Sequence, residues 1–285
     1  MWVSRQERSQ NGRGGSEVKR LIINADDFGY SVGVNHGIID SYRRGVLTST
    51  TLMPAMPGFE HAVGLAKENP GLGIGVHLTL TCGRPLLEGH KTLALENGDF
   101  PRKPYYLDER TVIDLDEVER EWTAQIERVL AAGIVPDHLD SHHHIHTYKG
   151  CESVFYALAR RYHLPVRNSW DCGDSFTGKY ESTPSDIVSP EKLLSYSVSY
   201  PVFRDDPRGY LDAIGDAARH VIAVDFESHD VLELMTHPAH IDYSIMVGSS
   251  FNVARAAETE LLTSPSFRTF LTEVQKIELV SFRSL

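Results

Sequence analysis

Short apolar runs alternate with segments of helical periodicity along most of the chain. Residues 21–24 form a buried-strand pattern, and apolar residues then recur at helical spacing until Gly45. This strand-then-helix unit repeats. Further strands are predicted over 46–53, 72–80, 134–139, 164–166, 231–235 and 277–280, and further helices over 59–66, 115–132, 154–162, 210–221 and 251–274.

Such alternation requires a mostly parallel sheet covered by helices. In a chain of 285 residues, a closed or nearly closed barrel competes with an open doubly wound sheet. We favour an α/β fold of the irregular, TIM-like (β/α) barrel type, as a single domain over 20–285. Residues 1–19 are expected to form a disordered tail. Two Gly- and Pro-rich stretches, 81–114 and 171–207, break the rhythm and are predicted to be long inserted loops of the kind that cover active sites.

Composition and charge narrow the class of protein. Hydrophobic residues make up 41% of the chain, and the net charge is −11 with no long basic run, which disfavours nucleic acid as a partner. No apolar stretch approaches the roughly 20 residues that a membrane span needs. Cys82, Cys151 and Cys172 form no C-x-x-C pair, which fits free thiols in a reducing cytoplasm. A symmetric homodimer is the default expectation for the assembly.

Polar residues follow four of the predicted strands. In a β/α fold the ligand lies at the carboxyl ends of the strands, so such residues already point toward a site. The first strand leads into two aspartates, the third contains a histidine, the fourth leads into a run of five histidines, and a late strand ends in two more. The residues are Asp26 and Asp27; His77; His138, His142, His143, His144 and His146; and His237 and His240.

The aspartate pair and the strand histidine each allow two interpretations. Asp26 and Asp27 could cap the helix that follows. Adjacent carboxylates repel each other, however, and a divalent cation would stabilise them, with one carboxylate binding the metal and the other accepting a proton. His77 alone would more often be a hydrogen-bonded core residue than a ligand. Gly73 and Gly75 on the same strand allow a backbone or a ligand to approach closely.

The histidine run is the strongest single signal. His142 and His146 share a face on a helix, and together with His144 they share a face on a strand. Neutral imidazole suits zinc and similar cations, and Asp140 could orient a ligating histidine by a hydrogen bond to its other ring nitrogen. The alternative is a solvated run of histidines. His237 could be a structural residue at a turn or a general acid that titrates near neutral pH.

Several motifs together resemble the YdjC-like carbohydrate deacetylase family, which includes the chitooligosaccharide deacetylases. They span residues 21–29, 45–51, 72–85, 137–146 and 235–242, with Ala25-Asp26-Asp27-Phe28-Gly29, His138-Leu139-Asp140-Ser141-His142 and His237-Pro238-Ala239 in the expected order. The resemblance implies an irregular β/α barrel that removes the acetyl group from an N-acetylated amino sugar or short chitooligosaccharide. The enzyme would be a hydrolase of a linear amide C–N bond.

The resemblance also implies roles for individual residues. Asp27, His77 and His142 would hold a divalent cation, magnesium or zinc. Asp26 would be the general base and His237 the general acid. His146 stands as a further ligand or site-lining residue, whereas His143, His144 and His240 receive no role. The 171–207 stretch aligns with nothing and is expected to shape the sugar site.

Two other functions stay open on the sequence alone. Carboxylate and histidine clusters at strand ends also serve metal-dependent phosphoester hydrolases, although the chain lacks a Gly-rich phosphate loop. A non-catalytic metal-binding protein could use the histidine run, but it would need neither Asp26 nor His237.

Overall fold

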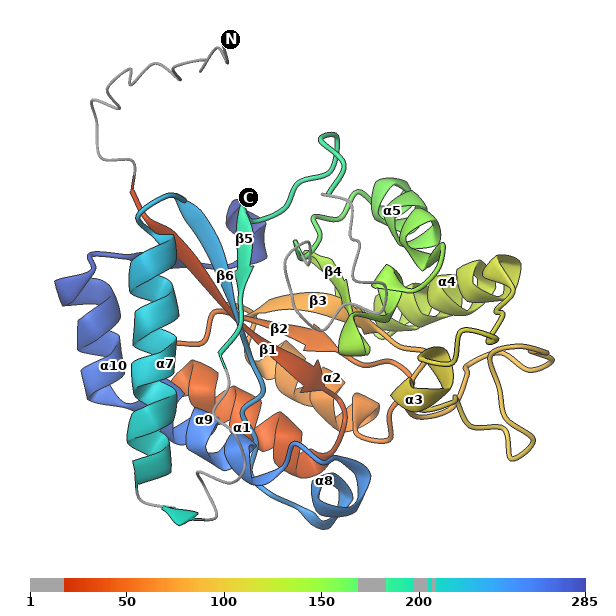
Figure 1. Cartoon of the computed structure of the whole chain (residues 1–285), viewed down its shortest axis with the longest axis horizontal. Coiled ribbons are helices and arrows are strands. Elements are labelled where there is room, and N and C mark those ends of the chain that lie inside the picture. The colour runs from red at the N-terminus through yellow and green to blue at the C-terminus, as the bar shows by residue number, and fades with distance from the viewer. Residues whose placement is uncertain (1–17, 169–182, 197–204, 207–208) are drawn as a thin grey trace, which may run out of the picture.

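The computed structural model describes residues 18–168, 183–196, 205–206 and 209–285 (Figure 1). Residues 1–17 of the expected disordered tail lie outside these ranges. Cys172 and more than half of the 171–207 stretch also lie outside them. Cys82 and Cys151 are free thiols. None of the helices within the described ranges combines the length and the apolar content that a membrane crossing needs.

In the part of the chain that the structure describes, one parallel sheet of seven strands forms the centre of the fold. Its order is β5–β6–β1–β2–β3–β4, and β7 pairs with the beginning of β1. The strands are β1 (Arg20–Phe28), β2 (Ser49–Leu52), β3 (Gly73–Leu78), β4 (Leu139–Ser141), β5 (Lys192–Leu194), β6 (Val231–Thr236) and β7 (Glu278–Val280). Beyond β4, an isolated parallel bridge joins Leu139 to Val166, whose N–H donates to the carbonyl of Val188 at 2.9 Å. The sheet therefore curls into a half-barrel, which confirms the predicted irregular barrel in a single α/β domain.

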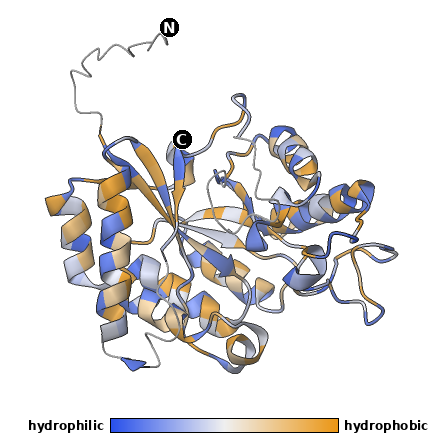
Figure 2. Cartoon of the chain, viewed as in Figure 1, coloured by the Kyte–Doolittle hydropathy of each residue, from blue (hydrophilic) through white to orange (hydrophobic). Residues whose placement is uncertain are grey.

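Helices cover the outside of the curled sheet, with α7 and α10 on one side of the view and α4 and α5 on the other (Figure 1). They are α1 (Val32–Arg43), α2 (Phe59–Glu68), α3 (Lys103–Tyr106), α4 (Leu115–Ala131), α5 (Cys151–Tyr162), α7 (Gly209–Asp225), α8 (Tyr243–Gly248), α9 (Val253–Thr263) and α10 (Pro265–Thr269). The described residues also form short turns of other helix types: η1 (His142–Thr147), η2 (Phe270–Val274) and η3 (Phe282–Ser284). Figure 2 shows apolar and polar residues alternating around the longer helices, as expected for amphipathic cover over one core.

The predicted elements are largely confirmed, with three corrections. The fourth strand is Leu139–Ser141 and not 134–139, because Pro136 has no N–H to give to the ladder. Residues 164–166 contribute only the isolated bridge at Val166, and β5 was not predicted because it is a three-residue strand inside an irregular stretch. The predicted helix over 251–274 is divided at Pro265, where α10 begins.

The predicted insertion over 81–114 is mostly irregular, with α3 as its one assigned helix. Two buried glutamates of α4 hold it. Glu121 accepts the backbone N–H groups of residues 86–87 at 2.9 and 3.1 Å, and Glu117 accepts those of residues 91–92 at 2.7 and 2.9 Å. The loop is therefore fixed to the scaffold next to the end of β3.

The close approach expected at Gly75 is made by a side chain. The ring of His138 is wholly buried and stacks on Phe282 with centroids 3.7 Å apart. A Cβ atom added at Gly75 would lie 2.5 Å from Cε1 of that ring. Glycine is thus required here because the histidine occupies the space inside the barrel.

We expect Gly75→Ala to lower the free energy of unfolding by about 1–3 kcal/mol, because the His138 stack must move to admit the methyl group. Gly64 provides a matched control, since it lies in α2 and an added Cβ there meets nothing within 4 Å. Gly64→Ala should leave stability unchanged or raise it by up to about 1 kcal/mol. Urea unfolding of the three proteins measures both effects, and equal stability of Gly75→Ala and the wild type would contradict the packing argument.

Candidate functional site

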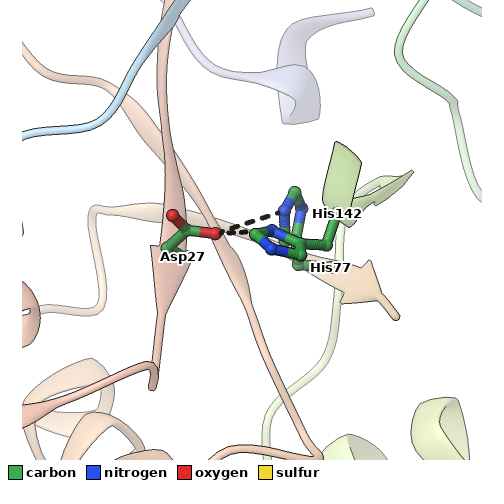
Figure 3. Close-up of side chains that lie close together, drawn as sticks. All are labelled: Asp27, His77 and His142. Carbon is green, nitrogen blue, oxygen red and sulfur yellow. Dashed lines mark ion pairs between the residues drawn. The ribbon is translucent and has the colours of Figure 1, made fainter. Parts of the chain in front are cut away.

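Three of the residues singled out from the sequence meet at the carboxyl ends of β1, β3 and β4 (Figure 3). Oδ1 of Asp27 lies 3.0 Å from Nδ1 of His142 and 3.5 Å from Nε2 of His77. One potential ligand atom from each residue lies within 4.8 Å of the other two. All three residues are buried.

An irregularity in β1 brings neighbouring aspartates to the same side. Successive side chains of a regular strand point to opposite faces. The pairing of β1 with β2 shifts register between Ala25 and Phe28, and Asp27 adopts a positive φ of 74°. A bulge of this kind re-aims a side chain. Asp26 and Asp27 can therefore both reach the site, at the cost of a conformation that non-glycine residues rarely adopt.

The far side of His77 is fixed by a carboxylate. Its Nδ1 lies 2.6 Å from Oδ1 of Asp140, and Oγ1 of Thr51 donates to the second Asp140 oxygen at 3.2 Å. A carboxylate can only accept here, so Nδ1 carries the proton and Nε2 presents its lone pair toward Asp27. This arrangement, a carboxylate behind a histidine, is typical of metal ligands.

The two oxygens of Asp27 have different surroundings. Oδ2 accepts from Arg255 at 2.7 Å, whereas Oδ1 is buried and accepts no hydrogen bond from any residue in the described ranges. Burial would raise the pKa of Asp27, but Arg255 and His142 outweigh it and hold the pKa well below its usual range. An ionised oxygen that faces two imidazole nitrogens fits a divalent cation, and one carboxylate with two imidazoles is a donor set that zinc accepts.

Asp26 is bound by a buried arginine that the sequence analysis did not single out. Arg167 donates to both Asp26 oxygens at 2.6 and 2.7 Å. The same guanidinium lies 2.9 Å from Oδ2 of Asp140 and 2.7 Å from Oε1 of Glu233. Burial would raise the pKa of Asp26, but the charge and hydrogen bonds of Arg167 lower it strongly, so the carboxylate stays ionised.

His237 follows β6 and lies on the other side of Asp26. Its Nε2 is 3.8 Å from Oδ2 of Asp26, and its backbone N–H donates to Glu258. The side chain is 24% exposed, and its ring contacts that of Phe251 at 5.5 Å between centroids. Burial is the main cause that lowers the pKa of His237 to about 4. The imidazole is therefore neutral at pH 7 in the protein as it stands.

No other histidine in the described residues belongs to the cluster of Asp27, His77 and His142. His146 is buried, bonds to Ser141 and stacks on Phe155 at 4.3 Å, so the structure turns it toward the core and not toward Asp27. His143 is exposed, and His240 pairs with Asp40 at 2.9 Å on the surface. His144 is buried, and burial lowers its pKa to about 4.

Four further charged residues surround the site, and only one could have been found from the sequence. Arg167 directly follows the apolar residues 164–166, so the strand-end rule that selected Asp26 applies to it as well. Glu233 lies inside an apolar strand. Arg255 and Glu258 reach in from α9, where no pattern distinguishes them from other helix residues.

Comparisons with known proteins agree on the family and on the fold. A family profile described as "YdjC-like protein" matches residues 20–273. A protein named carbohydrate deacetylase from Brevibacillus brevis is 40% identical over 93% of this chain and 99% of its own, and one from Geobacillus stearothermophilus is 38% identical over 92% and 96%. A crystal structure from Enterococcus faecalis V583, named provisionally as a cellobiose-phosphate cleavage protein, has a TM-score of 0.80 at 35% identity and covers 94% of this chain and 98% of its own.

Replacing Arg167 with Leu should lower the free energy of unfolding by about 3–5 kcal/mol, because three buried carboxylates lose their common partner. The loss should shrink as the pH falls below the ordinary Asp value of 3.8. The pKa of Asp26 is lowered in the folded protein, so its stabilisation is present above that value and is lost as the pH falls.

Arg161→Leu is the matched control for this experiment, since Arg161 pairs with Glu119 on the surface with 50% and 43% of the two side chains exposed. Its removal should cost less than about 1 kcal/mol. Denaturant unfolding between pH 3 and 7 compares the two variants. Equal losses in the two variants would show that the buried network contributes no more than a surface pair.

Proposed function

The chain belongs to the YdjC-like protein family, and on this premise we propose that it is a carbohydrate deacetylase, which hydrolyses the N-acetyl group of an amino sugar or a short N-acetylated oligosaccharide. The observation that carries the proposal is the meeting of Asp27, His77 and His142 beside a second ionised carboxylate and a partly exposed imidazole. Relatives of about the same length, at 38–40% identity, are named carbohydrate deacetylase.

Asp27, His77 and His142 would hold the divalent cation, magnesium or zinc. When bound, the cation would polarise the acetyl carbonyl and make water more acidic. Arg255 contributes by holding Oδ2 of Asp27, which leaves Oδ1 directed at the two imidazoles. Asp140 contributes by holding the proton on Nδ1 of His77.

Asp26 is the general base in this proposal. Its Oδ2 faces both His77, at 4.0 Å, and His237, at 3.8 Å, so it borders the place where a water molecule would attack. Arg167 keeps this oxygen ionised and fixed in place. The same ion pair makes Asp26 a weak base, so the proton it receives is readily passed on.

His237 is the general acid. Cleavage of the amide leaves an amine that must gain a proton, and a neutral imidazole close to Asp26 can receive that proton and deliver it from Nε2. Glu258 fixes the backbone of His237, and Phe251 packs against its ring. The ring is thereby oriented while its edge stays partly exposed.

The metal-loaded protein should release acetate from N-acetylated chitooligosaccharides, and Asp26→Asn should lower kcat by about 10²–10⁴-fold with little change in KM. Asp40→Asn, on the surface, is the control and should retain the wild-type rate. Phosphate release alone would instead favour a phosphoester hydrolase, and tight metal binding without turnover would favour a non-catalytic metal-binding protein.

Metal binding can be measured without a substrate. Calorimetry of the chelator-treated protein should show one zinc ion per chain, and Asp27→Asn should weaken its affinity by at least the roughly 100-fold that loss of an outer partner can cost. His240→Gln, at an exposed histidine, should bind as the wild type does. Unchanged affinity in Asp27→Asn would place the ion elsewhere.

A further inference from the structure

The barrel interior beneath the proposed site contains polar side chains that the proposed reaction does not use. His138, Glu233 and Asn24 are each 0% exposed. One polar atom of each has no hydrogen-bond partner among the described residues: Nε2 of His138, Oε2 of Glu233 and Oδ1 of Asn24. Unpaired buried polar atoms are costly and rare, so three in one region call for a common explanation.

Strand register places these residues in the layer below the site. His77 pairs with Asp140, so His138 lies one inward-facing step lower, level with Gly75. Glu233 of β6 pairs with Ile22 of β1. Asn24 lies two residues after Ile22 on the same face of β1, so it is a diagonal neighbour of Glu233. Burial raises the pKa of Glu233, whereas Arg167 and, more weakly, His138 lower it, so the imidazole lies within electrostatic reach of the carboxylate.

All three unpaired atoms are acceptors. Nδ1 of His138 lies 2.6 Å from Oδ1 of Asp137, which places the ring proton on Nδ1 and leaves a lone pair on Nε2. Asn24 donates its amide N–H to Asp26 at 3.0 Å, so its Oδ1 is the free end. Acceptors cannot satisfy one another. Water, with two O–H donors, can bridge two of them, and buried waters commonly serve such groups.

We propose that buried water donates to Nε2 of His138 and Oε2 of Glu233 and that His138 thereby acts as a positioning residue for Asp26. This role in positioning rests on the proposed function, whereas the water bridge does not. The connection runs from Glu233 to Arg167 at 2.7 Å and from Arg167 to Asp26 at 2.6 Å. On the other side, Asp137 is held by Arg283 at 3.0 Å, near the chain's end.

The water bridge can be tested by NMR without metal or substrate. The imidazole ¹⁵N shifts of His138 should report a proton on Nδ1 and a hydrogen-bonded acceptor at Nε2, with a cross-peak from the ring to a long-lived water. Glu233→Gln should shift the Nε2 resonance, because the amide changes what the water can accept and donate. An unshifted Nε2 resonance together with no water cross-peak would overturn the bridge.

Positioning is tested with His138→Phe, which keeps the stack on Phe282 and removes both nitrogens. The Nε–H resonance of Arg167 should shift, and kcat should fall about tenfold at unchanged KM and zinc affinity, the lower end of what outer partners cost. Phe282→Leu is the control, because it loosens the same stack and keeps the nitrogens. It should lower stability and leave kcat and the Arg167 resonance unchanged.

The outcomes separate this inference from the proposed function. If neither the wild type nor any variant releases acetate, the proposed function is wrong. The Arg167 resonance alone then decides whether His138 positions the ion-pair network. If the wild type is active and His138→Phe leaves both kcat and that resonance unchanged, positioning by His138 is overturned. If His138→Phe does not fold, His138→Leu supplies the same two readouts, since it also removes both ring nitrogens and leaves the contact between Glu233 and Arg167 intact.

Discussion

One buried guanidinium organises the candidate site. Arg167 is 1% exposed and contacts carboxylates from three different strands, Asp26 of β1, Asp140 of β4 and Glu233 of β6. Each of these carboxylates would be unfavourable alone in the interior, because burial penalises its charged form. The arginine therefore fixes the relative positions of three strand ends, and the chemistry proposed for Asp26 depends on that geometry.

The balance of buried charge argues independently for a cation. Four carboxylates lie in the connected network, and two guanidinium groups oppose them: Asp26, Asp27, Asp140 and Glu233 against Arg167 and Arg255. Burial would lower the pKa of His142, but Cys82 and Asp27 raise it well above its usual range, so without a metal this imidazole is protonated. With the other groups ionised, the network then carries one negative charge in excess. A divalent cation between Asp27, His77 and His142 would displace the His142 proton and so leave the network neutral.

The position of residues at strand ends predicted the site better than the spacing of histidines within the run from His138 to His146. The rule that ligands gather at the carboxyl ends of strands led to Asp27, His77 and His142, which the structure brings together. The histidine run was interpreted through helix and strand periodicity, and neither applies, because His143 and His144 both have positive φ angles. That backbone reversal sends His142 toward Asp27 and His146 into the core. Arg255 and Glu258 could not be predicted from the sequence, because they meet the site only through the packing of α9 in the folded chain.

The carboxylate oxygens of the network differ in their hydrogen-bond partners. Both oxygens of Asp26 and both of Asp140 have donors or imidazole partners within 3.2 Å. Asp27 and Glu233 each have one oxygen bound by an arginine. The second oxygen of Asp27 faces Nδ1 of His142 at 3.0 Å, whereas the second oxygen of Glu233 has no hydrogen bond in the described structure. An unpaired buried acceptor such as this Glu233 oxygen is costly. In the two proposals made above, the Asp27 oxygen would bind a cation and the Glu233 oxygen would accept from water.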